Sequence, residues 1–364
     1  MIASARTEGK RHPLPQVSGL ALPHPLDAEW RFTDATLQEL LDLAISLTNI
    51  GDTISLVGVP SVAMAAAART DERRYVVKGE NNVISDGVVR RTSLDSRFRQ
   101  DDLREGQATA VMVDPPWYLP QFKEMLGEAS RACQVGGFVL VSLPENGVRP
   151  GIEDDLSQIA TAASEAGLEF CERRERWLGY RTPFFELNAM RAAGVLAWLP
   201  EWRRGTLVVY RKRSAGERWP APPKPAAFEL TLQGVRIRLL ANEEGRGEKT
   251  MVAVHPGEIF PSVSARAANR SKASLWTTGN RAFIAPYTET LRALLELSER
   301  RGVLPKRLEG ELLRLRNGTS IDSVESLIQT LIELADREIA EAASLLGAEA
   351  WERSTNDARF LNAS

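Results

Sequence analysis

The tetrapeptide Asp114-Pro115-Pro116-Trp117 carries the clearest chemical signal in this chain. It follows residues 109–113, an apolar run that predicts a strand buried on both faces. Ligands of open α/β sheets bind at the carboxyl ends of strands, so we expect the tetrapeptide to lie at a binding site. The prolines stiffen the backbone and remove two N–H donors. The remaining carboxylate and prolyl carbonyls can accept hydrogen bonds from an amino group, while the indole holds a flat or cationic partner.

A second candidate is the turn in Ser-Leu-Val-Gly-Val-Pro-Ser, residues 55–61, where a predicted strand leads into a predicted helix. We expect Gly58, Pro60 and Ser61 to bind a cofactor there, because a helix N-terminus can hold a carboxylate. A single glycine argues against a dinucleotide, whose pyrophosphate needs a glycine-rich turn. An ordinary turn between a strand and a helix is the structural alternative.

Two acidic residues further along the chain could complete a cofactor site. Glu80 comes just after the predicted strand at residues 74–78, where an acid commonly takes ribose hydroxyls. Asp95 could flank an adenine ring. Each could also be a solvated acid in a loop, and for Asp95 we favour that alternative.

The elements that must position these residues alternate between strands and helices from about residue 30 to residue 213. This alternation predicts an α/β fold with a mostly parallel sheet and right-handed crossovers. A proline-rich segment at residues 214–226 predicts a stiff linker. We therefore expect an N-terminal tail or late-packing arm at residues 1–29, the α/β domain at 30–213, a small β-containing domain at 227–286 and a helical module at 287–364.

Composition excludes several classes of protein. The 364 residues are 43% hydrophobic and 26% charged, with a net charge of −2, which is typical of a soluble globular protein. No apolar run approaches the roughly 20 residues of a membrane span. Only two cysteines and three histidines occur, so a disulfide scaffold, a metal site and a histidine-based triad are not expected. We expect a cytoplasmic protein that makes no membrane contact.

The segment from about Trp30 to Arg213 resembles the N6-adenine-methyltransferase-like class of Rossmann-fold enzymes. The resemblance rests on residues 55–61, the acidic position after the second strand, and Asp-Pro-Pro-Trp after the fourth. Within that class it is most similar to the family containing the lysine methyltransferases of elongation factor 1A. The resemblance implies a class I methyltransferase sheet, S-adenosylmethionine as cofactor, and Asp114 to Trp117 as the catalytic residues.

The same resemblance implies a substrate segment after the next strand. Residues 177–188 are rich in aromatic side chains, and the elongation-factor family has an aromatic and polar substrate segment in the comparable place. By this likeness Arg181, Phe184, Phe185 and Asn188 would line the acceptor site. Ordinary core packing of the two phenylalanines is the structural alternative.

A basic stretch in the second half of the chain suggests a different contact. Residues 259–288 contain Arg266, Arg270 and Lys272, with Trp276 among them. Basic side chains with an interleaved aromatic can hold a nucleic-acid backbone and stack on a base. A solvated basic loop is the alternative that we favour for this stretch.

We therefore expect a methyltransferase that acts on an amino group, with adenine N6 in nucleic acid marginally ahead of a protein lysine. A methyltransferase-like scaffold that has lost its cofactor is the third interpretation. The C-terminal helices offer a surface for a protein partner in any of these cases.

Overall fold

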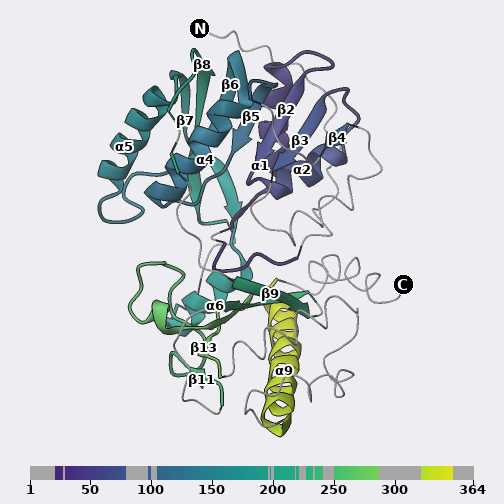
Figure 1. The fold of residues 1–364 in the computed structure, drawn as a ribbon, viewed down its shortest axis with the longest axis vertical. Coiled ribbons are helices and arrows are strands. Elements are labelled where there is room, and N and C mark those ends of the chain that lie inside the picture. The colour runs from purple at the N-terminus through teal and green to yellow at the C-terminus, as the bar shows by residue number, and fades with distance from the viewer. Residues whose placement is uncertain are drawn as a thin grey trace.

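The protein consists of a larger α/β unit followed by a smaller unit built from a second sheet and a long helix (Figure 1). The computed structural model describes residues 21–27, 29–78, 97–99, 105–195, 197, 201–217, 219–220, 227–232, 234–240, 250–286 and 321–346.

The first sheet has eight strands in the order β1-β7-β8-β6-β5-β2-β3-β4. The central strands β6, β5, β2, β3 and β4 run parallel, whereas β8 lies antiparallel between β6 and β7. The sheet is therefore mixed, with a parallel half. This arrangement confirms the predicted Rossmann-like α/β fold class. Its strands are β1 Arg31–Phe32, β2 Thr53–Val57, β3 Arg74–Lys78, β4 Phe98–Arg99, β5 Ala108–Val113, β6 Cys133–Pro144, β7 Leu168–Arg181 and β8 Arg204–Lys212.

Helices cover both faces of this sheet, as Figure 1 shows. Helices α1 (Asp34–Ser46) and α2 (Pro60–Ala67) pack on one face, and α4 (Leu119–Ala132) and α5 (Ile152–Glu165) pack on the other. Successive residues of a strand point to opposite faces. Accordingly, Ala110 and Met112 of β5 join the core under α1 and α2, while Val111 and Val113 join the core under α4. Burial of this strand on both sides was predicted from its apolar sequence and is confirmed.

The smaller unit has a five-stranded antiparallel sheet in the order β11-β13-β12-β10-β9. Leu327, Leu331 and Leu334 of helix α9 share one core with this sheet, so the sheet and the helix form a single packed unit among the described residues. The predicted boundary at residue 287 runs within that unit. Its elements are β9 Ala227–Leu232, β10 Val235–Leu240, β11 Val252–Ala253, the short helix η1 Arg270–Lys272, β12 Leu275–Thr277, β13 Ala282–Ile284 and α9 Ile321–Leu346.

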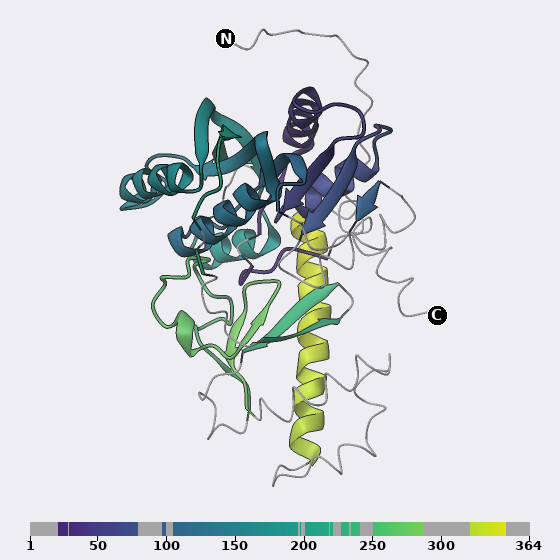
Figure 2. The same cartoon turned by 45° about the horizontal axis from the view of Figure 1, so that its top comes forward.

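Two segments join the units. Helix α6 (Phe184–Ala192) contacts α9, and in Figure 2 α9 extends from the small sheet toward the larger unit. Residues 21–27, which the sequence placed in a tail or arm, pack against the smaller unit. Leu22 shares a buried cluster with Phe184 of α6 and Ala342 of α9. In the described part of the chain, no helix is both long and apolar enough to cross a membrane.

Candidate active site

Asp114 lies where β5 ends, at the carboxyl edge of the parallel half of the sheet, as predicted. Its half-buried carboxylate accepts a hydrogen bond from the Tyr180 hydroxyl, with 2.9 Å between the hydroxyl oxygen and Oδ1. Tyr180 comes from β7, and its hydroxyl also forms a hydrogen bond with that of Ser142 on β6. Residues near the carboxyl ends of three strands, β5, β6 and β7, thus position one carboxylate.

Burial raises the pKa of Asp114 to about 7, because the charged form loses hydration. Hydrogen bonds from Ser142 and Tyr180 and the charge of Arg203 oppose this rise, whereas the charge of Glu29 adds to it. The carboxyl therefore changes charge near neutral pH. A group with such a pKa can accept a proton from a substrate and release it again.

Aromatic rings surround this carboxylate. The Trp117 ring meets the Tyr180 ring edge-on at 6.0 Å between centroids. Trp30, which lies just before β1, makes similar edge contacts with Tyr180 at 6.5 Å, Phe185 at 6.3 Å and Trp202 at 6.0 Å. These rings give the site a largely apolar wall with negative ring faces.

A cation lies among these rings. The guanidinium of Arg203 is 3.6 Å from the centroid of Trp30 and 5.1 Å from the centroids of both Trp117 and Trp202. Burial lowers its pKa, and the charges of Glu186, Tyr180, Tyr118 and Asp114 oppose that shift. Burial likewise raises the pKa of Glu186.

The β2–α2 turn contains the predicted cofactor residues Gly58, Pro60 and Ser61. Gly58 has a φ of +65°, a left-handed backbone conformation that favours glycine, and a Cβ there would come 2.6 Å from Met125 Cε, so that this side chain would have to shift. Pro60 is the first residue of α2, as suits a helix start. Ser61 is buried, and the residue before the helix is Val59, whose side chain cannot cap it; no side-chain cap forms there. The other two predicted cofactor residues, Glu80 and Asp95, lie outside the described residues.

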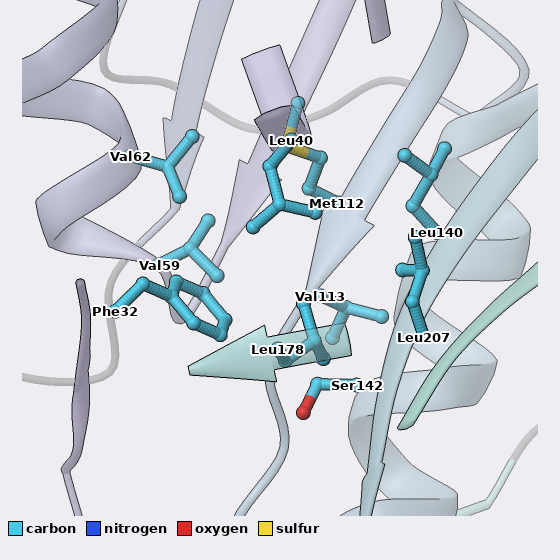
Figure 3. Close-up of a pocket in the computed structure, with 10 residues that line it drawn as sticks. All are labelled: Phe32, Leu40, Val59, Val62, Met112, Val113, Leu140, Ser142, Leu178 and Leu207. Atoms are coloured by element: carbon cyan, nitrogen blue, oxygen red, sulfur yellow. The ribbon is translucent and has the colours of Figure 1, made fainter. Parts of the chain in front are cut away.

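A small cavity lies behind this turn (Figure 3). Its volume is about 10 Å³, which suffices for about one water molecule. Figure 3 shows Val59 and Phe32 on one side and Ser142, the only polar lining residue, on the other. This cavity is too small for a nucleoside. A donor would have to lie outside this cavity.

The predicted substrate residues divide between two places. Phe185 contacts Trp30 and so belongs to the aromatic wall. Phe184 and Asn188 are buried between the units, where the Asn188 amide donates to the carbonyl of Gly279 at 3.0 Å. Arg181 forms an exposed ion pair with Asp34 at 2.6 Å. These three residues therefore do not gather at Asp114: Phe184 and Asn188 of α6 face the smaller unit, and Arg181 at the end of β7 lies at the surface.

The predicted nucleic-acid residues are also divided. Trp276 is fully buried in β12, and Arg270 covers its ring at 4.4 Å while donating to the carbonyl of Pro25 at 3.1 Å. Trp276 cannot stack on a base without leaving the core of the smaller unit, so this prediction is wrong for Trp276. Arg266 and Lys272 are exposed. The loop that contains Ala265 contacts the residue next to Trp117: the backbone N–H of Ala265 donates a hydrogen bond to the Tyr118 hydroxyl, at 3.0 Å.

Sequence reasoning missed several residues of the site. Trp30 marked the expected start of the α/β domain, and Tyr180 fell within the aromatic-rich segment 177–188 but was not singled out there. Tyr180 and Ser142 beside Asp114, and Arg203 beside the tryptophans, are far from them in the sequence. Only the order of the strands in the sheet brings them together. The sequence has eight tryptophans, but those at positions 30, 117 and 202 are far apart along the chain, so the sequence does not show that their rings meet. The missed residues are Glu29, Trp30, Ser142, Tyr180, Glu186, Trp202 and Arg203.

No known protein family matches the sequence, and no curated protein matches it. Solved structures that share part of the fold include a branched-chain polyamine synthase mutein from Thermus thermophilus in complex with N4-aminopropylspermidine and 5'-methylthioadenosine. That structure is 16% identical, with 56% of this chain and 64% of that chain covered and a TM-score of 0.47. The present chain thus spans less than two thirds of that protein.

Two further structures are similar over about half of the chain. The N-methyltransferase NodS from Bradyrhizobium japonicum is 13% identical, with 50% of this chain and 96% of that chain covered and a TM-score of 0.34. An RNA methyltransferase from Pyrococcus horikoshii is 16% identical, with 54% and 92% covered and a TM-score of 0.36. At these identities the likeness concerns the fold, which the strand order establishes independently.

Proposed function

We propose that this chain transfers a methyl group from S-adenosylmethionine to the amino nitrogen of a cationic aliphatic amine, such as a protein lysine. The observation that carries this proposal is the Asp114 carboxylate with its raised pKa, held at a strand end by Tyr180 and faced by Trp117. An ammonium group is attracted to a carboxylate and to indole faces, so this site suits such an acceptor.

In this proposal Asp114 has two tasks. As a carboxylate it orients the ammonium, and it then accepts one of the ammonium protons so that the nitrogen lone pair becomes available. The Tyr180 hydroxyl keeps the carboxylate in place through the bond to Oδ1. Trp117 shields the nitrogen from water on one side. The proton later passes from Asp114 to solvent.

The residues that would hold the donor are those of the β2–α2 turn, Gly58 to Ser61, together with Glu80 and Asp95. When bound, S-adenosylmethionine would supply a methyl group on a positively charged sulfur, which leaves as a neutral thioether when the nitrogen–carbon bond forms. Among the described residues, this proposed site consists of the turn at Gly58, whose φ is positive, and the first residues of α2.

Adenine in nucleic acid, which the sequence placed marginally ahead, is now the less supported acceptor. The base-stacking partner expected of it, Trp276, is a core residue, and Arg270 is occupied by Trp276 and Pro25. An adenine would also have to be flipped out or single-stranded to reach Asp114.

One observation favours the second candidate, a methyltransferase-like scaffold without a cofactor. The cavity behind the β2–α2 turn is nearly filled by apolar side chains, including that of Val59. Calorimetry with S-adenosylhomocysteine separates the two functions. We expect saturable binding for an enzyme, and absence of binding at millimolar ligand would favour the scaffold.

The acceptor is tested by incubating the full chain with S-adenosylmethionine and, separately, with butylamine, a lysine-containing peptide and a single-stranded adenine oligonucleotide. We expect mass spectrometry to find one added methyl group on the amines and none on the oligonucleotide. Methylation of the oligonucleotide alone would overturn the proposed acceptor.

A further inference from the structure

Three indole rings meet beside the Asp114 carboxylate, and we refer to Trp30, Trp117 and Trp202 as the indole cage. They come from three distant parts of the chain: the segment before β1, the end of the β5 motif and the segment before β8. The cage holds the guanidinium of Arg203, 3.6 Å from the Trp30 centroid and 5.1 Å from the other two. A cation within about 6 Å of an aromatic face is attracted by the ring electrons.

The environment of the partly buried Arg203 differs from that of the buried Arg236 and Arg281, and also from that of Arg270, which covers Trp276 but donates a hydrogen bond to Pro25. Within the described residues, the guanidinium of Arg203 forms no ion pair and no hydrogen bond. Arg236, in contrast, is paired with Glu229 and Asp27, and Arg281 with Glu338 and Glu341. A guanidinium that is partly buried for structural reasons alone would ordinarily form ion pairs with carboxylates. The cage therefore provides for a positive charge without fixing this particular side chain by specific bonds.

The cage is accessible from solvent on one side. The side chain of Trp202 is 43% exposed, and Arg203 lies just before β8, where a change of its side-chain rotamer disturbs no strand pairing. The guanidinium could thus move out and leave a cation-sized space between the rings. Two carboxylates whose charges act on Arg203, those of Glu186 and Asp114, would remain beside that space.

We propose that the indole cage is a binding site for an organic cation, an alkylammonium or guanidinium group, and that Arg203 occupies this site until such a ligand displaces it. This inference rests on the proposed function in one point: the ligand is the cationic part of the acceptor that reacts at Asp114. The cage itself can be tested without any donor or transfer.

The test uses choline and its uncharged isostere 3,3-dimethylbutan-1-ol as probes, with binding to the full chain measured by calorimetry. Replacing Arg203 by Ala removes the occupant, so we expect choline to bind Arg203→Ala at least tenfold more tightly than wild type. The isostere should bind Arg203→Ala at least tenfold more weakly than choline, because it lacks the charge. A further Trp30→Ala change should abolish the gain.

Arg203→Gln, which retains a polar side chain without the charge, provides a second variant if the alanine variant does not fold. Arg191→Ala, a change of an exposed arginine on α6, is the matched control and should leave choline binding unchanged. Equal affinity of wild type and the Arg203 variants for choline would overturn the proposal, as would equal affinity for choline and its isostere. Loss of transfer with intact choline binding would count against the proposed function alone.

Discussion

Arg203 in the larger unit is partly buried and Arg236 in the smaller unit is fully buried, and their surroundings are opposite. Arg236 is fully buried and bonds to both oxygens of Glu229 and to Asp27, and these neighbours raise its pKa. Arg203 lies among indole rings, and burial lowers its pKa. The ion pairs of Arg236 account for its buried charge within the protein itself. Arg203 has no such partners among the described residues, so its surroundings are a candidate ligand site.

The carboxylates show the same contrast. Glu338 of α9 is fully buried but accepts hydrogen bonds from Arg281, Thr277 and the backbone of Gly279. Glu186 Oε2 and Glu29 Oε2, near Asp114, have no hydrogen-bond partner in the described part of the chain. In the described part of the chain Glu338 is thus compensated by three donors, whereas Glu186 has an oxygen without a partner and Glu29 is paired with Arg31 only through its other oxygen.

The strongest expected effect is on stability, and it concerns Arg236. Arg236→Met should lower the free energy of unfolding by about 3–5 kcal/mol, because Asp27 and Glu229 lose their fully buried partner and keep only Arg238. Arg203→Met should change it by less than about 1 kcal/mol, since no ion pair is lost. Urea denaturation of both variants measures the difference. If both variants lost the same free energy of unfolding, the proposed difference between the two arginines would be wrong.

A smaller stability effect, of opposite sign, is expected at Asp114. The folded-state pKa of about 7 exceeds the ordinary value of 3.8, so the stability contributed by the protonated carboxyl is lost as pH rises toward 7. Asp114→Asn should therefore be more stable than wild type by up to about 4 kcal/mol at pH 8, at roughly 1.4 kcal/mol per pKa unit. Thermal unfolding followed across pH should show this advantage disappearing below about pH 4. A constant difference across pH would contradict the assigned pKa.

The smallest effect is expected for an exposed ion pair. Arg181→Ala breaks the pair with Asp34, whose two side chains are 45% and 38% exposed. We expect a change of less than about 0.5 kcal/mol in the free energy of unfolding and no change in amine transfer. If Arg181→Ala lowered the transfer rate as much as Asp114→Asn does, Arg181 would have to be part of the acceptor site.

The sequence predicted the elements of the larger unit better than it predicted the site. The helix at residues 34–46, for example, can be read from the sequence alone, because Thr33 can cap it and its apolar residues recur at helical spacing. Asp114 was also placed correctly, since the position of a strand end follows from local pattern. Tyr180 and Trp30 were missed because β7 and β1 lie next to each other only through pairing between distant segments. Trp276 was misinterpreted because charge in the neighbouring sequence does not reveal whether an aromatic ring faces solvent.

The pH dependence of methyl transfer to butylamine, in wild type and in Asp114→Asn, tests the central claim most directly. If Asp114 accepts the ammonium proton, the wild-type rate should rise about tenfold per pH unit below pH 7 and level off above it. The Asn variant should be at least 100-fold slower at pH 7.5 and should keep rising to pH 9, because it can use only amine that is already neutral. Identical profiles for the two proteins would contradict the account.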